Sequence, residues 1–160
     1  MSFLTRFSYV LISVALIALG TVFAVLTEYG NVIGTVTFLL AAALIIYWVA
    51  ARRGARTPVN PGKRIRRART GDRPIAVCFY HDFNLASLLQ RPFTAKAERE
   101  AKGHCDFIYI DAYHHEAGPV LEEFEAEVGD WLLFDATGKL VEKTGSVSLA
   151  KLEGLRKRAQ

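Results

Sequence analysis

The chain has 160 residues, 51% of them hydrophobic, and a formal net charge of +4 at pH 7. That length holds two membrane spans and one small domain, and it excludes a large multidomain enzyme. The charge is distributed unevenly: residues 1–50 carry only Arg6 and Glu28, residues 51–73 carry nine Lys and Arg, and residues 74–160 carry ten Lys and Arg against fourteen Asp and Glu. The basic character therefore belongs to the segment 51–73 and not to the domain after it.

Residues 1–50 predict a transmembrane helical hairpin. Two segments without charge, residues 7–27 and residues 32–50, are each close to the ~20 apolar residues that cross a bilayer. The short break between them leaves no room for a domain, so the two helices are expected to be antiparallel. Tyr47 and Trp48, at the end of the second segment, suit the interfacial layer. No Asp, Glu, Lys, Arg or His lies within either span, which argues against ion or proton transport.

Residues 51–73 predict a basic tether that contains Pro and Gly and is extended and solvated. Lys and Arg next to a span mark the cytoplasmic side, so we expect the N-terminus and the C-terminal domain both to be cytoplasmic. Basic residues near the membrane also attract anionic lipid headgroups. Nucleic acid is not an expected partner, because no aromatic residues alternate with the basic ones. The candidate headgroup contacts are Arg52, Arg53, Arg56, Lys63, Arg64, Arg66 and Arg67.

Residues 74–160 predict a small α/β domain with the element order βαβαββα. Apolar runs predict strands at residues 75–80, 106–111, 131–135 and 140–143, and helices are expected at residues 84–102, 118–128 and after Ser148. Asn84 and Ser148 are the expected helix N-caps. Strands joined through helices are expected to be parallel, and the tight turn at residues 136–139 makes the last two strands antiparallel.

This order resembles the thioredoxin fold across residues 74–160. The first strand ends in an aromatic residue, Pro92 matches the proline that kinks the helix after the redox motif, and Gly138-Lys139 match a late hairpin turn. On this alignment Asn84 and Ser87 stand where the family carries its two redox cysteines, and Gly129 stands where it carries a cis-proline. The resemblance therefore implies a membrane-anchored member that lacks the CxxC motif and the dithiol chemistry that depends on it.

Polar and aromatic residues follow the strands at one edge of the predicted sheet, where ligands bind in open α/β sheets. His81, Asp82, His114 and His115 are weak candidate ligands for a divalent metal, because imidazoles and carboxylates bind such ions. The same edge also predicts a protein-binding surface, since aromatic side chains dominate interfaces. The candidates for that surface are Phe83, Tyr113, Asp130 and Trp131, and the alternative, above all for Trp131, is packing in the core of the domain.

We therefore expect a redox-inactive, membrane-anchored thioredoxin-like protein that is an accessory subunit or an assembly or scaffold factor of a membrane complex. Its expected partners are other membrane protein subunits and anionic lipid headgroups, and neither a cofactor nor enzymatic activity is expected. One alternative is a metal-binding or enzymatic domain that uses the His/Asp cluster. Another is a thiol–disulfide protein that uses Cys78 or Cys105, although both cysteines are expected to be buried and inert.

Overall fold

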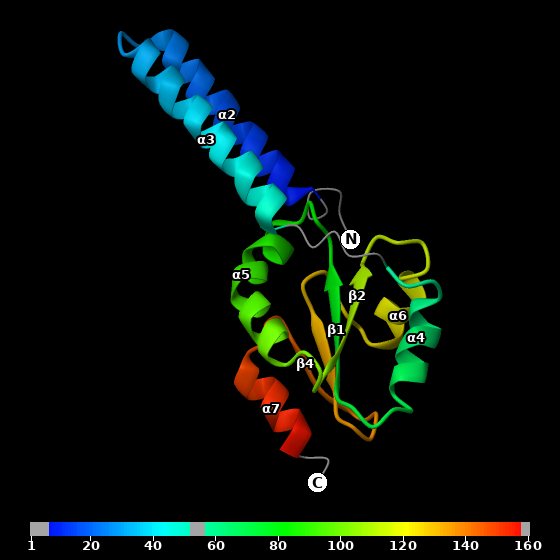
Figure 1. Ribbon diagram of the computed structural model, residues 1–160. Helices are drawn as coiled ribbons and strands as arrows, with labels where there is room; N and C mark the ends of the chain where they lie inside the picture. The colour runs from blue at the N-terminus through cyan, green and yellow to red at the C-terminus, as the bar shows by residue number, and fades with distance from the viewer. Residues whose placement is uncertain (1–6, 52–56, 158–160) are drawn as a thin grey trace.

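A computed structural model describes residues 7–51 and 57–157. Two long helices, α2 (Ser8–Leu26) and α3 (Gly30–Ala51), project from a mixed α/β domain (Figure 1). The domain contains α4 (Pro61–Ala68), β1 (Ile75–Tyr80), α5 (Leu85–Glu100), β2 (Asp106–Asp111), α6 (Gly118–Glu123), β3 (Trp131–Phe134), β4 (Leu140–Thr144) and α7 (Leu149–Lys157).

Helices α2 and α3 form an antiparallel pair, which confirms the predicted helical hairpin to within a few residues (Figure 1). Both helices are long and apolar enough to span a membrane. They approach closely at Gly20, where an added Cβ atom would collide with the hydroxyl of Thr37. A small residue at such a contact allows two helices to pack against each other.

The sheet has the strand order β2-β1-β3-β4. Strands β1 and β2 are parallel, and β3 is antiparallel to both of its neighbours. The expectation that all helix-connected strands are parallel is therefore wrong for β3. The reason is the length of α6: six helical residues cover ~9 Å, whereas the six-residue strand β2 is ~20 Å long. The chain therefore re-enters the sheet at the edge where β2 ended.

Two layers of helices cover the two faces of the sheet (Figure 1). Helices α5 and α7 pack on the face that contains Cys78 and Trp131, whereas α4 and α6 pack on the face that contains Phe79 and Phe134. Successive residues of a strand point to opposite faces, so each central strand contributes to both cores. Strands β1 and β3 are buried along their whole length, as expected for strands covered on both faces.

Helix α4 corrects the prediction of a solvated tether over residues 51–73. Pro61 begins this helix, Ile65 is buried four residues later, and Ala68 packs on the same core. This spacing places three apolar side chains on one helical face, which docks beside α6. Just after α4, Arg69 donates a hydrogen bond to the carbonyl of Gly138 (2.7 Å). The segment therefore belongs to the domain core from Pro61 onward.

Other boundaries differ little from the prediction. The expected helix at residues 118–128 stops at Glu123, and the chain leaves helical geometry at Glu125, where φ is +50°. Ser148 begins the last helix as predicted, because its hydroxyl accepts a hydrogen bond from the Lys151 amide (3.4 Å). The predicted β3–β4 hairpin is confirmed.

Candidate functional site at the hairpin-proximal edge

The candidate site lies at the edge of the sheet next to the hairpin, which we call the proximal edge. Tyr80 and Asp111 are paired at the ends of parallel strands β1 and β2, so the residues that follow both strands meet there. The loop before β3 joins them: Gly129 donates to the Phe79 carbonyl (2.7 Å), and the Phe79 amide donates to the Asp130 carbonyl (2.9 Å). The sequence correctly predicts that these segments share one edge.

The two positions aligned with redox cysteines serve as a helix cap. The Asn84 side chain accepts a hydrogen bond from the Ser87 amide (3.1 Å), which satisfies a backbone donor in the first turn of α5. The Ser87 hydroxyl accepts a hydrogen bond from the His81 amide (3.2 Å). Both side chains are buried. Asn84 and Ser87 therefore stabilise the turn between β1 and α5, and neither position supplies a nucleophilic thiol.

His81 forms the centre of a buried polar and aromatic cluster. Its Nδ1 atom lies 3.0 Å from Oδ1 of Asp111, and the same oxygen accepts a hydrogen bond from the Tyr113 amide. The rings of Tyr113 and Phe83 meet the imidazole edge to face, with centroids 4.7 and 5.6 Å away. Among the described residues, no hydrogen-bond partner reaches the buried Nε2 atom. The imidazole and the carboxylate lie at hydrogen-bonding distance, as in a catalytic pair, but the His81 side chain is only 7% exposed.

The base of the hairpin covers this cluster. Nε1 of Trp48 donates to the Asp82 carbonyl (2.8 Å), and the Tyr47 hydroxyl donates to the Leu88 carbonyl (3.1 Å). The Trp48 ring stacks on Phe83, with centroids 5.6 Å apart and an interplanar angle of 17°. These contacts use donors from α3 to satisfy carbonyls around the start of α5.

The other hairpin helix contacts the same turn. The Tyr9 amide donates to the Phe83 carbonyl (3.1 Å), and the Ser8 hydroxyl accepts from the Leu85 amide (3.0 Å). Both helices of the hairpin therefore contact the turn that contains Asn84 and leads into α5. We call this set of contacts the junction, and it joins residues up to 77 positions apart.

The four residues predicted to form a protein-binding edge do not share one open surface. Trp131 is fully buried in the sheet, so its ring offers no area to a partner. Phe83 lies under Trp48, and Tyr113 packs against His81. Asp130 accepts a hydrogen bond from the Glu127 amide (2.9 Å). The aromatic side chains of this edge therefore bind the protein's own hairpin and core.

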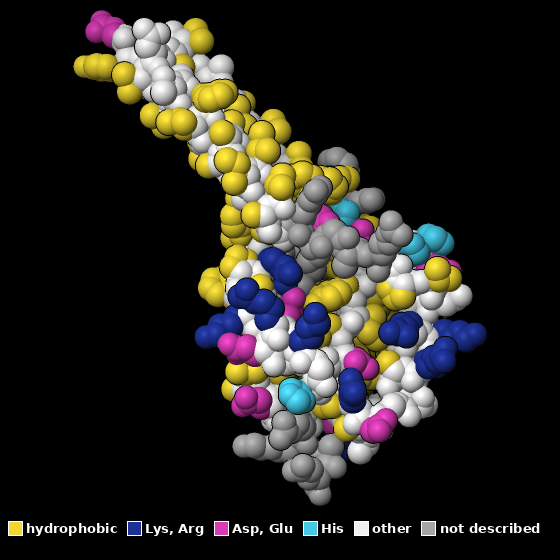
Figure 2. Space-filling model, in the orientation of Figure 1, with side chains coloured by type: hydrophobic (Ala, Val, Ile, Leu, Met, Phe, Trp, Pro, Cys, Tyr) yellow, Lys and Arg dark blue, Asp and Glu magenta, His cyan; other side chains and the backbone are white. Residues whose placement is uncertain are grey.

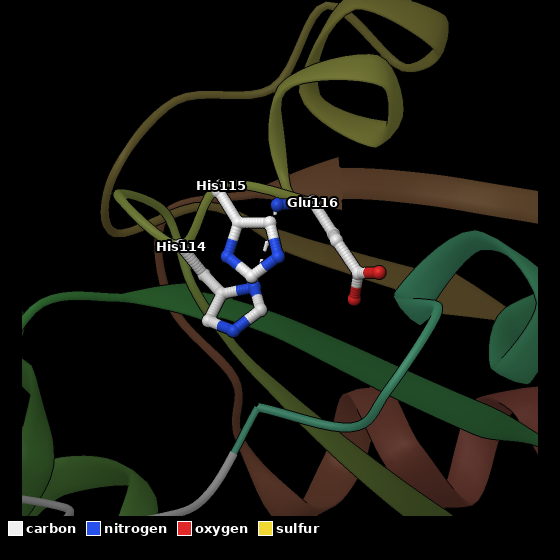
Figure 3. Close-up of side chains that lie close together, drawn as sticks. All are labelled: His114, His115 and Glu116. Carbon is white, nitrogen blue, oxygen red and sulfur yellow. Dashed lines mark hydrogen bonds between the residues drawn. The ribbon is translucent and has the colours of Figure 1, made fainter.

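His114, His115 and Glu116 are the residues that come closest to a metal site in the described part of the chain (Figure 3). One ligand atom from each lies within 4.8 Å of the others, and the two imidazole rings lie 4.3 Å apart. A carboxylate oxygen of Glu116 already accepts the Asn60 amide (3.0 Å). Of the four predicted metal ligands, His114 and His115 belong to this group, whereas His81 and Asp82 do not. Glu116 was not predicted as a ligand.

Gly129 occupies the position that the resemblance gives to a cis-proline. Its φ is +98°, a conformation that favours glycine, and an added Cβ would meet the Gln90 amide at 3.2 Å. Gly129 therefore allows the chain to turn back into β3 at this edge.

Cys78 and Cys105 are both buried, and neither forms a disulfide within the described residues. Burial, followed by the nearby Asp106 carboxylate, raises the pKa of Cys105 to about 12. A thiol with such a pKa carries almost no thiolate at neutral pH, and thiolate is the reactive form.

The headgroup candidates divide into two groups. Lys63, Arg64, Arg66 and Arg67 are exposed on α4, and Arg52, Arg53 and Arg56 lie outside the described residues.

The junction was not predicted from the sequence, although Tyr47 and Trp48 at the end of the second apolar segment were a usable signal. Aromatic residues with a polar atom often find a partner when they are partly buried.

A comparison with protein-family models finds no match for this chain, and a comparison with curated proteins finds none.

Proposed function

We propose that this protein is a redox-inactive, membrane-anchored thioredoxin-like protein that serves as an accessory subunit or an assembly or scaffold factor of a membrane complex. The observation that carries the proposal is the junction. The hairpin binds the turn at which a thioredoxin-like protein presents its redox motif, and that turn contains Asn84 and Ser87 in place of cysteines. The proximal edge is therefore used to fix the hairpin to the domain.

The thioredoxin-like assignment is supported by the topology. A parallel pair β1–β2, an antiparallel pair β3–β4 and a helix that contains Pro92 after β1 all agree with the resemblance. The membrane assignment is supported by the two apolar helices, and the basic residues after α3 favour a cytoplasmic domain. The short loop between the spans favours the same side for the N-terminus.

The junction supports the scaffold role. Within the described residues, four hydrogen bonds and one aromatic stack join the hairpin to the domain, so a partner that binds the spans would also orient the domain. Spans without ionisable residues suit packing against other membrane helices. The partners proposed are therefore other membrane protein subunits.

The test is isolation of the tagged full-length chain from native membranes in several mild detergents, with the mass and composition of the complex measured. A defined assembly of fixed stoichiometry is expected. A monomer in every detergent would contradict the scaffold role. Trp48→Ala is the informative variant, because it weakens the junction, and Val59→Ala is its control at an exposed site outside the junction.

A second candidate function is binding of a divalent metal, and the group formed by His114, His115 and Glu116 favours it. Two imidazoles and one carboxylate are a common donor set for zinc and for other transition metals. The test is calorimetric titration of the full-length protein with Zn²⁺. His115→Ala should abolish binding, whereas His104→Ala, an exposed histidine on another loop, should not change it. Equal binding by both variants would exclude this site.

A further inference from the structure

An apolar stripe on α5 begins inside the junction and continues onto the outer surface of the domain. Leu85 packs against the hairpin cluster around Tyr9 and Leu88. Leu89 and Phe93 follow at intervals of four residues, which places all three on one helical face. Leu89 is 49% exposed and Phe93 is 79% exposed. In Figure 2, apolar side chains likewise continue from the hairpin onto the side of the domain.

This stripe is unusual for the described part of the domain. Only two other large hydrophobic side chains of residues 57–157 are comparably exposed, Val59 and Leu140, and neither lies on α5. The opposite face of α5 already contributes Ser87 and Thr94 to the interior. The helix is therefore apolar on a second face that folding of the domain does not cover.

The hairpin indicates the depth at which this face lies. Tyr47, at the end of the second span, donates its hydroxyl hydrogen to the carbonyl of Leu88. Tyrosine and tryptophan at span ends mark the boundary between hydrocarbon and headgroups. Leu89 is the next residue of α5, and Phe93 lies one helical turn beyond it, ~6 Å along the axis. The headgroup layer is roughly 5–8 Å thick in each leaflet, so both side chains fall within it.

We infer that the outer face of α5, formed by Leu89 and Phe93, binds the interfacial layer of the same membrane that the hairpin crosses. The apolar side chains insert between lipid headgroups. Lys96 lies three residues after Phe93, its side chain is 77% exposed, and its ammonium group lies 3.9 Å from the Glu100 carboxylate. On this inference lipid phosphates are further partners of that ammonium group. The domain then has two attachments to the bilayer and a fixed tilt. This inference rests on the proposed membrane anchoring, and it adds a second contact to it.

The test uses the full-length chain in phosphatidylcholine vesicles that contain phosphatidylglycerol. A fluorophore whose emission depends on polarity is attached to Phe93→Cys, and to Lys139→Cys on the exposed turn between β3 and β4 as a matched control. The native cysteines are buried, and the unmodified chain measures their background. We expect lipids that carry a nitroxide near the headgroup to quench the label at position 93 several-fold more than the label at position 139. Leu89→Cys provides an independent label position.

Three results would overturn or separate the claims. Equal quenching of positions 93 and 139 by aqueous iodide would overturn the inference, because the face would then be in water. Protection from iodide without quenching by nitroxide lipids would also overturn it, because a protein would then cover the face. A label at Leu39→Cys, within the second span, tests the membrane anchor separately: if deep nitroxides fail to quench it, the proposed function fails.

Leu89→Asp, introduced into the chain labelled at position 93, sharpens the test. A charge on the same face should lower the nitroxide quenching several-fold, whereas Leu140→Asp on the edge strand β4 should leave it unchanged. Equal effects of the two substitutions would contradict a specific role for this face.

Discussion

The two ends of the sheet are stabilised in different ways. At the proximal edge, backbone groups around the start of α5 are satisfied by side chains from distant segments, such as Trp48 and Ser8. At the opposite, distal edge, the turn after β3 is held by Asp135, whose carboxylate accepts hydrogen bonds from Thr137 and Lys139. The distal edge is therefore stabilised by contacts between residues close in the sequence, whereas the proximal edge depends on contacts with the docked hairpin. Helix α4 connects the two edges.

The largest expected effect comes from a substitution that weakens the packing of α4 on the sheet. Ile65→Ala should destabilise the domain by about 2–4 kcal/mol, because Ile65 is 2% exposed and its loss leaves a cavity between α4 and the sheet. Chemical denaturation monitored by circular dichroism measures the change. Val59→Ala is the control, since that side chain is 83% exposed and should shift stability only slightly. Equal effects would mean that α4 does not dock through Ile65.

A smaller effect is expected at the proximal edge alone. Trp48→Ala removes a hydrogen bond to Asp82 and the stack on Phe83, so the junction should lose about 2 kcal/mol. Hydrogen exchange should accelerate at the Leu85 amide and not at the distal amides of Thr137 and Lys139. Trp48→Phe retains an aromatic ring and should show a smaller change. Unchanged exchange at Leu85 would contradict the junction.

The matching change at the distal edge is Asp135→Asn. It should cost about 1–2 kcal/mol and accelerate exchange at Thr137 and Lys139, with no effect on Leu85. The Thr137 hydroxyl, which donates to the carboxylate, is the main cause that lowers the pKa of Asp135. Since the folded pKa is the lower one, this stabilisation is present above the unfolded pKa of ~3.9 and is lost as the pH falls through the folded pKa. The Asn variant should lack that acid-dependent component.

The smallest expected effect concerns the thiols. Neither Cys78 nor Cys105 should react with iodoacetamide in the folded protein at neutral pH, because both are buried and the pKa of Cys105 is about 12. Mass spectrometry of the native and the denatured protein measures the difference. Rapid alkylation of either cysteine in the native protein would support the alternative of a thiol–disulfide protein.

Local patterns in the sequence correctly predict most elements. Two uncharged runs predict both hairpin helices, and the caps at Asn84 and Ser148 begin helices where expected. These signals are readable because hydrophobic period and capping act over a few residues. Helix α4 was missed because its apolar face contains only Pro61, Ile65 and Ala68 among many basic residues. Its docking depends on a core that the chain builds later.

The candidate site was less predictable than the fold. The sequence brings His81, Asp111 and the His114–Glu116 segment to one edge, since that follows from parallel strands β1 and β2. It does not predict that Phe83 stacks on Trp48, because aromatic residues suit both cores and interfaces. Core packing was the alternative interpretation of Trp131, and the structure confirms it. The antiparallel direction of β3 was also missed, since it depends on the short length of α6.

The sequence by itself determined two apolar helices, an α/β domain and the absence of cysteines at Asn84 and Ser87. These properties follow from composition, period and residue identity, which act locally. Only the tertiary structure decided that the hairpin docks on the turn after β1, and that Leu89 and Phe93 remain uncovered on α5. Contacts between residues 34 to 77 positions apart depend on how the folded helices and strands pack against each other, and a local sequence pattern does not determine that packing.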